Sequence, residues 1–263
     1  MIKNFTLLLF LLLSIKSSLL AQITNDSIVK DSIVKDSLKF KFDNKLKFNY
    51  KQLIIPAVLI GYGTWATDND QLELFNIEIR EEVTEHIDNK ITIDDFSQYA
   101  PLVSTFALDF AGIKSKNKLR DKTIISATAT LMMAITVSVI KKTAQVERPD
   151  KSNFYSFPSG HTATSFMGAE LLYQEYKDKS IWYGVSGYLV ATGTGVFRML
   201  NNRHWLSDVV TGAGIGILSA KAAYWLFPSI NKLISKNKSS NNKTVFIPFY
   251  NGKITGFGLV SQF

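Results

Sequence analysis

The chain is organised around KKTAQVERP (residues 141–149), PSGH (158–161) and RMLNNRHWLSD (198–208). Two of its three histidines, His161 and His204, lie inside these stretches. A carboxylate follows the second of these histidines by one helical turn, and cations occur in the first and third stretches. This inventory is typical of phosphoryl transfer through a histidine nucleophile, in which the protein positions the phosphoryl group and neutralises its charge.

The third stretch supplies the candidate nucleophile. If a helix begins just after His204, Asp208 lies one turn further on and accepts a hydrogen bond from one ring nitrogen. The other nitrogen is then unprotonated and can attack phosphorus. A phosphohistidine intermediate needs no metal, so we predict no metal site. The alternative is a membrane-interface histidine beside Trp205, with Asp208 serving the helix N-terminus.

The second stretch directly precedes a predicted helix over 162–176. Backbone N–H groups at a helix start bind anions, and Gly160 permits a phosphate to approach the main chain. His161 is then placed as the general acid that protonates the leaving oxygen. The alternative is a plain N-cap at Ser159 beside an exposed histidine.

Three cations complete the predicted site. Arg148 offers a planar fork for two phosphate oxygens, and Lys141 acts as a point charge. Arg198 begins the third stretch. Without the other motifs, the cations at 141–148 would be interpreted equally well as a cluster at a membrane interface.

The spacings Lys-x6-Arg-Pro, Pro-Ser-Gly-His and Arg-x5-His-x3-Asp resemble three signatures of the type 2 phosphatidic acid phosphatase (PAP2)/vanadium haloperoxidase superfamily, in the family's order. The resemblance covers about residues 123–227. One departure is Phe197, which stands where the third signature usually has serine, so a hydroxyl near the phosphate is missing. The resemblance implies catalytic roles for His204, His161 and Asp208, and phosphate binding by Lys141, Arg148, Ser159, Gly160 and Arg198.

The amino-acid composition limits the classes of binding partner and of chemistry that are expected. The net charge of +8 and the pI near 9.4 favour anionic partners. The lysines are spread along the chain and no nucleic-acid-binding motif is visible, so nucleic acid is not predicted as a partner. Cysteine is absent, which excludes disulfides, thiolate catalysis and zinc–thiolate sites.

The N-terminal part is predicted to lie outside the catalytic domain. Residues 1–21 are interpreted as a signal peptide, with Lys3 before an apolar run; the alternative is an uncleaved first hydrophobic helix. Residues 22–52 form a low-complexity, basic linker in which Asp-Ser-Ile-Val-Lys occurs twice.

Residues 53–228 are predicted to form an all-α helical bundle. The acidic residues scattered over 68–95, with His86 alone among them, are interpreted as a solvated helical face. The last helix is rich in glycine and alanine, which permits close helix–helix approach. The predicted helices are 53–66, 99–113, 123–140, 162–176, 181–197 and 208–227.

The bundle is predicted to be embedded in the inner membrane. Lysine and arginine at 114–122 indicate a cytoplasmic segment, which puts the three motifs on the periplasmic face. A soluble periplasmic bundle is the alternative, since the mean hydropathy of +0.06 is low for six spans. Residues 229–263 are predicted to be a basic tail and a β-hairpin around Asn251-Gly252.

The sequence therefore predicts a metal- and cofactor-independent phosphatase of the cell envelope. Its substrate would be a phosphomonoester or pyrophosphate of a lipid, or a small phosphoester, and its partner a membrane. One alternative is a vanadium-dependent haloperoxidase, with vanadate in the same cradle. The other is a non-enzymatic membrane protein that binds phosphate or lipid.

Overall fold

The computed structural model describes residues 50–85, 92–236, 243–250 and 255–262. The predicted signal peptide at 1–21, most of the linker at 22–52, His86 and the Asn251-Gly252 turn lie outside the described residues.

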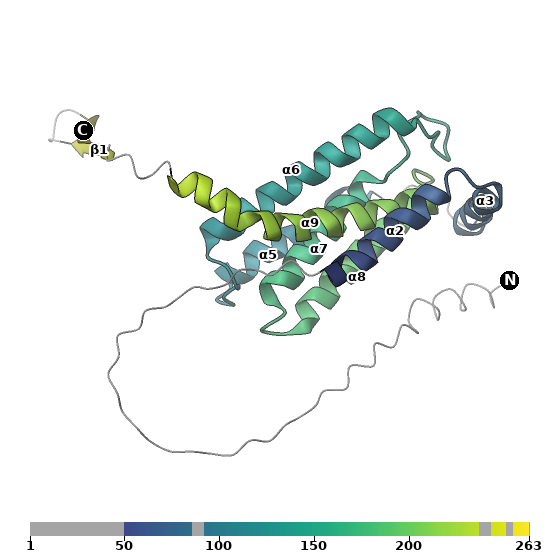
Figure 1. The fold of residues 1–263 in the computed structure, drawn as a ribbon, viewed down its shortest axis with the longest axis horizontal. Helices are drawn as coiled ribbons and strands as arrows, with labels where there is room; N and C mark the ends of the chain where they lie inside the picture. The colour runs from purple at the N-terminus through teal and green to yellow at the C-terminus, as the bar shows by residue number, and fades with distance from the viewer. Residues whose placement is uncertain (1–49, 86–91, 237–242, 251–254, 263) are drawn as a thin grey trace, which may run out of the picture. The chain divides into compact units, whose positions relative to one another are not determined.

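The chain folds into a helical bundle, as predicted (Figure 1). Each predicted helix is present, with its ends within a few residues of those expected except at the end of the last helix, and the acidic segment forms two further helices. The helical elements are η1 (Tyr50–Leu53), α2 (Ile54–Trp65), α3 (Asp70–Thr84), α4 (Ile93–Ser97), α5 (Ala100–Phe110), α6 (Leu119–Ala144), α7 (Gly160–Tyr176), α8 (Ile181–Leu200) and α9 (Leu206–Lys236).

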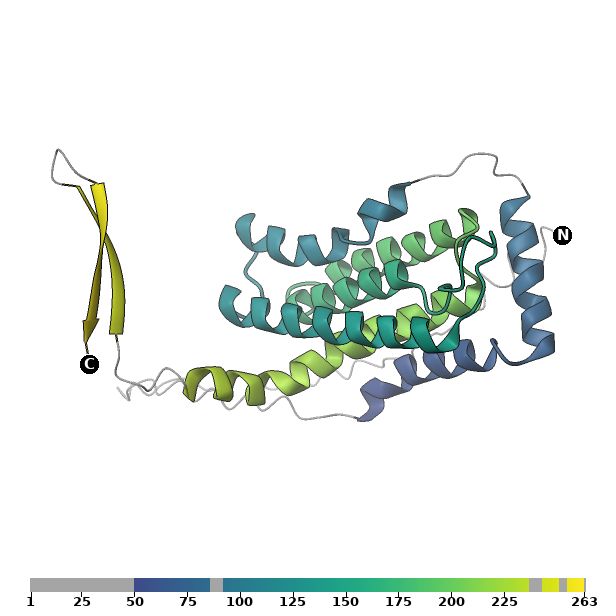
Figure 2. The ribbon, with the colours of Figure 1, turned by 90° about the horizontal axis from the view of Figure 1, so that it is seen from above.

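Helix α7 lies at the centre of the bundle and packs against α5, α6, α8 and α9 (Figures 1 and 2). Its inward side chains Ala163, Met167 and Leu171 join the hydrophobic core with residues of α6 and α9. Because α7 is enclosed, its first turn is held in a fixed position relative to the ends of α6, α8 and α9. All three predicted motifs meet at this end of the bundle.

Helices α7 and α9 approach each other closely, as the glycine-rich composition of α9 predicts. A Cβ atom at Gly212 would lie 2.5 Å from the carbonyl oxygen of Ser159, and one at Gly216 would lie 2.3 Å from that of Ala163. Neither position can hold a side chain without moving the backbone opposite. The contact at Gly212 brings α9 directly against the start of α7.

Two helix ends differ from the prediction. Helix α9 continues through Pro228 to Lys236, whereas the bundle was expected to end at residue 228. Helix α6 already begins at Leu119, so the second half of the basic segment 114–122 belongs to a helix.

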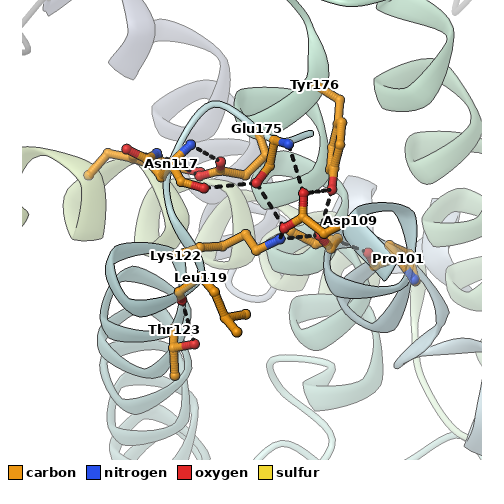
Figure 3. A network of polar contacts seen from close by, with 11 residues as sticks. Pro101, Asp109, Asn117, Leu119, Lys122, Thr123, Glu175 and Tyr176 are labelled. Carbon is orange, nitrogen blue, oxygen red and sulfur yellow. Dashed lines mark hydrogen bonds and ion pairs between the residues drawn. The ribbon is translucent and has the colours of Figure 1, made fainter. Parts of the chain in front are cut away.

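The basic segment closes a network of polar contacts around the last turn of α7 (Figure 3). Lys122 is only 1% exposed and pairs with Asp109, while its Nζ also donates to the Thr105 carbonyl at 2.8 Å. The Tyr176 hydroxyl donates to the same carbonyl at 3.0 Å. Asn117 Nδ2 donates to Glu175 Oε1 at 2.7 Å. Lys122 is therefore part of the structure's interior, although the sequence analysis used it only as one of the cations that indicate a cytoplasmic segment.

Strands β1 (Lys243–Tyr250) and β2 (Thr255–Gln262) pair antiparallel, with Lys243 opposite Gln262 and Tyr250 opposite Thr255. Among the described residues, two segments are long and apolar enough to cross a membrane: α6, which is mostly exposed, and Leu206–Ser235 of α9, which is mostly buried in the bundle.

Candidate active site

His204 and Asp208 lie together where α9 begins. The helix starts at Leu206, so Asp208 falls in its first turn and its Oδ2 lies 3.3 Å from His204 Nδ1. Trp205 N donates to the same oxygen at 2.9 Å, and Ser156 Oγ also donates to it. Asp208 is 0% exposed, so three neighbours hold a fully buried carboxylate in place. The predicted nucleophile pair is thus brought together.

The environment of His204 keeps its ring neutral. Burial lowers the pKa of His204 to about 4, against the opposing effect of the hydrogen bond and charge of Asp208. A ring whose Nδ1 is committed to Asp208 presents Nε2 for reaction. At neutral pH the imidazole therefore has the protonation state that a nucleophile requires.

His161 occupies the second position of α7. Ser159 caps this helix: its Oγ accepts from Thr162 N at 3.4 Å and shares a 2.8 Å hydrogen bond with Thr162 Oγ1. The Ser159 backbone N–H donates to the Asp208 carbonyl at 3.0 Å, which ties the second motif to the third. Ser159 is 0% exposed and its hydroxyl caps the helix, and its contact with phosphate stays a prediction.

The three predicted cations surround the same end of the bundle. Lys141, in the last turn of α6, donates from Nζ to the Tyr155 carbonyl at 2.6 Å and the Ser156 carbonyl at 3.1 Å. Arg148 Nε and Arg198 Nε are both buried without a hydrogen-bond partner among the described residues. Burial and the nearby positive charge of Arg198 lower the pKa of Arg148. Two Nε donors without partners at the same end of the bundle are suited to an anion with several oxygens.

Two acidic residues from the segment that the sequence analysis interpreted as a solvated face contact residues of the predicted site. Asp94, in α4, is 1% exposed, and its Oδ2 accepts from Arg198 NH1 at 2.6 Å. Asp95 Oδ1 lies 3.0 Å from His161 Nε2. No motif marks these aspartates, since they reach the site through the packing of α4 against α7 and α8. Ser156, which bonds Asp208, was missed for the same reason.

The aspartates raise the question of a metal. One ligand atom from each of Asp94, Asp95 and His161 lies within 4.8 Å of the others. Arg198 NH1, however, lies 2.6 Å from an oxygen of Asp94 and 3.8 Å from one of Asp95. The guanidinium already balances the two carboxylates, so the donor set fits an arginine better than a metal ion.

A cavity of about 190 Å³ lies beside the motif residues, on the side of α2 and α3. Its wall includes Trp205, whose Nε1 donates to the Glu147 carbonyl at 2.9 Å. Asn76 of α3 forms two hydrogen bonds with Ser207, which hold this wall together. The lining residues are Ala66, Thr67, Glu73, Asn76, Val146, Glu147, Trp205 and Ser207.

Part of the chain is similar to a known family. Residues 122–232 match the family model described as "PAP2 superfamily". This segment contains all three motifs and helices α7 and α8, so the resemblance predicted from the motifs is confirmed over this part of the chain.

Two curated relatives are similar in sequence. The chain is 42% identical to the Lipid A 1-phosphatase of Porphyromonas gingivalis over 135 residues, which cover 51% of this chain and 30% of that protein. It is 33% identical to the bacitracin transport permease protein BcrC of Bacillus licheniformis over 76 residues, covering 29% of this chain and 36% of that one. The chain thus matches about a third of the length of each relative.

Two solved structures are similar in fold. LpxE of Aquifex aeolicus has a TM-score of 0.44 and 22% identity, covering 57% of this chain and 94% of that chain. The PAP2-type phosphatidylglycerolphosphate phosphatase of Bacillus subtilis has a TM-score of 0.43 and 16% identity, covering 68% and 97%.

Proposed function

We propose that this protein is a metal-independent phosphatase that removes phosphate from a lipid through a phosphohistidine intermediate. The observation that carries the proposal is the buried pair of His204 and Asp208, which lies at the same end of the bundle as the unpaired guanidinium atoms of Arg148 and Arg198. A neutral imidazole beside fixed positive charge is suited to attack a phosphate and to stabilise the charge that develops.

The reaction would proceed in two steps. First, His204 Nε2 forms a bond to phosphorus while the bond from phosphorus to the ester oxygen breaks, and His161 gives its proton to that oxygen. Second, water attacks the phosphohistidine, His161 takes a proton from the water, and His204 is released with inorganic phosphate. In both steps Asp208 stabilises the positive charge on His204, and the cations bind the phosphoryl oxygens.

The substrate would be a lipid whose phosphate ester or pyrophosphate lies at the membrane surface. Lipid A carrying a 1-phosphate is our first candidate, because the relative named Lipid A 1-phosphatase shares 42% identity over a region that includes half of this chain. A lipid pyrophosphate is the second candidate. Lys141, Arg148 and Arg198 would bind the phosphate of either.

We place the bundle in a membrane because of its outer surface. Helix α6 presents Leu131, Ile135 and Val139, which are 61%, 55% and 54% exposed, at four-residue intervals along one face. An exposed apolar stripe of this kind fits lipid and is rare on the surface of a soluble protein. Leu189 of α8, 68% exposed, and Val58 of α2, 63% exposed, are further apolar side chains on the surface of other helices.

The direct test is phosphate release by the purified protein in detergent with EDTA present. The panel would contain lipid A, a lipid pyrophosphate, phosphatidic acid and para-nitrophenyl phosphate. We expect release from at least one lipid, unaffected by EDTA and inhibited by orthovanadate, which mimics five-coordinate phosphorus. Loss of activity on chelation that a divalent ion restores would refute the mechanism. Halide oxidation with vanadate and peroxide would support the haloperoxidase instead.

A further inference from the structure

His161 faces a carboxylate that the proposed reaction does not yet use. Asp95 Oδ1 lies 3.0 Å from His161 Nε2, although the two residues are 66 positions apart. The side chain of His161 is 29% exposed and that of Asp95 is 54% exposed. The contact therefore forms at the rim of the site, where substrate and solvent can reach the ring.

Helix α4 is fixed so that Asp95 keeps this position. The preceding residue, Asp94, is buried and accepts from Arg198 NH1 at 2.6 Å and from Asn201 Nδ2 at 3.0 Å. Ser97 Oγ shares a 2.9 Å hydrogen bond with Thr194 Oγ1 of α8. An isolated exposed ion pair contributes little to stability, because forming it requires both side chains to be ordered. Here the neighbouring contacts already order the helix that carries the carboxylate.

The charges around His161 oppose one another. Burial and the positive charge of Arg198 lower the pKa of His161, whereas its hydrogen bond to Asp95 and the charges of Asp94 and Asp95 raise it. A general acid must carry its proton when the substrate arrives. The two aspartates of α4 are thus the groups that favour the protonated ring beside a cationic cradle.

We propose that Asp95 is a positioning residue for the general acid His161, which it holds with Nε2–H toward α4 and Nδ1 toward the leaving oxygen. The inference rests on the proposed function. The protonated ring gives its Nδ1 proton to the leaving oxygen and becomes the neutral Nε2–H form, which still donates to Asp95. In the second step Nδ1 takes a proton from water. Asp95 keeps the neutral His161 ring in one tautomer throughout and does not exchange a proton itself.

The test compares Asp95→Ala and Asp95→Asn on two substrates that differ in their need for an acid. Para-nitrophenolate leaves without much help, whereas an alkoxide needs the proton. For Asp95→Ala we expect kcat to fall about tenfold on an alkyl phosphate, but less than about twofold on para-nitrophenyl phosphate. Asparagine can still accept from Nε2–H, so Asp95→Asn should keep much of the kcat that Asp95→Ala loses. The alkaline limb of its kcat–pH profile should lie at lower pH than in the parent protein. Asp178→Asn, an exposed carboxylate on the α7–α8 turn, is the matched control.

The same change in a His161→Ala protein provides a second readout. If Asp95 acts through His161, Asp95→Ala should cause no further loss there. A loss that persists, or equal losses on both substrates in the parent protein, would refute the positioning role. A lower KM and higher kcat in Asp95→Ala would mean that Asp95 competes with phosphate, which also refutes it.

The tautomer can be measured without turnover. In ¹⁵N-histidine spectra of the protein in detergent, His161 should be in the Nε2–H form in the neutral parent and lose this preference in Asp95→Ala. An Nδ1–H tautomer in the parent would refute the inference even if the protein is an active phosphatase. Absence of phosphatase activity with the Nε2–H form intact would instead refute the proposed function and leave the contact standing.

Discussion

Arg198 and Asp94 form a buried ion pair 104 positions apart in the sequence, with 2.6 Å between NH1 and Oδ2. The pair joins α4 to the last turn of α8, where Arg198 would otherwise be free to rotate. Because NH1 is taken by Asp94, the unpartnered Nε of Arg198 keeps a fixed direction. A guanidinium held this way is prepared for phosphate before the substrate binds.

Replacing Asp94 with asparagine should therefore weaken substrate binding. The neutral amide removes a charge-assisted hydrogen bond that contributes about 1.5–3 kcal/mol, and Arg198 gains freedom. We expect KM for a phosphate ester to rise about tenfold or more, which corresponds to about 1.4 kcal/mol. Thermal unfolding in detergent should also occur at lower temperature, because breaking a buried pair is costly. Initial rates and unfolding curves beside Asp178→Asn provide the measurement. An unchanged KM would show that Arg198 needs no anchor.

Helix positions were predictable because long apolar segments between polar or glycine-containing breaks show where helices lie. The end of α9 was not predictable from the sequence. Proline usually stops a helix, but α9 continues through Pro228. Pro228 is exposed and lacks the N–H that would donate to the Tyr224 carbonyl within the helix, yet α9 continues for eight residues beyond it.

The candidate site was predictable to the extent that its residues lie in short motifs. His204 and Asp208 are separated by one helical turn, which brings them together, whereas His161 reaches this end of the bundle through the packing of α7 against α9. Asp94 and Asp95 could not be found this way. They come from a five-residue helix whose position depends on tertiary packing, and aspartates in an acidic segment are more often solvated. The Ser159 hydroxyl caps α7, and its binding of phosphate stays a prediction.

Because α7 and α9 are in close contact, we predict that adding one methyl group at Gly212 lowers the free energy of unfolding. Gly212→Ala would place a Cβ 2.5 Å from the Ser159 carbonyl oxygen, so the start of α7 must shift. We expect a loss of about 1–3 kcal/mol in unfolding free energy and a fall in activity, because His161 lies in that turn. Gly193→Ala on α8 is the control, since nothing lies within 4 Å of its Cβ position. Equal melting temperatures for the two variants would contradict the predicted packing.

The two histidines predict an acidic pH optimum. His204 attacks as the neutral ring, and its pKa, lowered to about 4, leaves it neutral at any higher pH. His161 must be protonated, and its pKa is lowered from 6.5, so activity should fall as pH rises through that lower value. We expect kcat/KM for an alkyl phosphate to be highest between about pH 4 and 6.5. The profile should be measured at constant ionic strength. An alkaline limb that survives His161→Ala would assign the titration to another group.

The orientation in the membrane is testable with single cysteines in a chain that has none. Ser152 and Lys114 are exposed, and they flank opposite ends of α6, whose 26 residues span about 39 Å. A periplasmic site predicts that Ser152→Cys reacts with an impermeant thiol reagent in intact spheroplasts, whereas Lys114→Cys reacts after lysis. The reverse pattern would invert the topology. Reaction of both in intact cells would favour a soluble exported bundle.

The last prediction separates the two histidines by their roles. His204→Ala removes the nucleophile, so rapid quenching with labelled substrate under alkaline conditions, which preserve phosphohistidine, should trap no phosphoenzyme. His161→Ala removes the acid, so it should lose about 10²–10⁴-fold on an alkyl phosphate and far less on para-nitrophenyl phosphate. Asp208→Asn should lower both activities by a similar factor, because Asp208 orients His204 and stabilises its charge during attack itself. Trapped phosphoenzyme in His204→Ala would place the nucleophile elsewhere. Equal losses on the two substrates for His161→Ala would mean that another group supplies the proton.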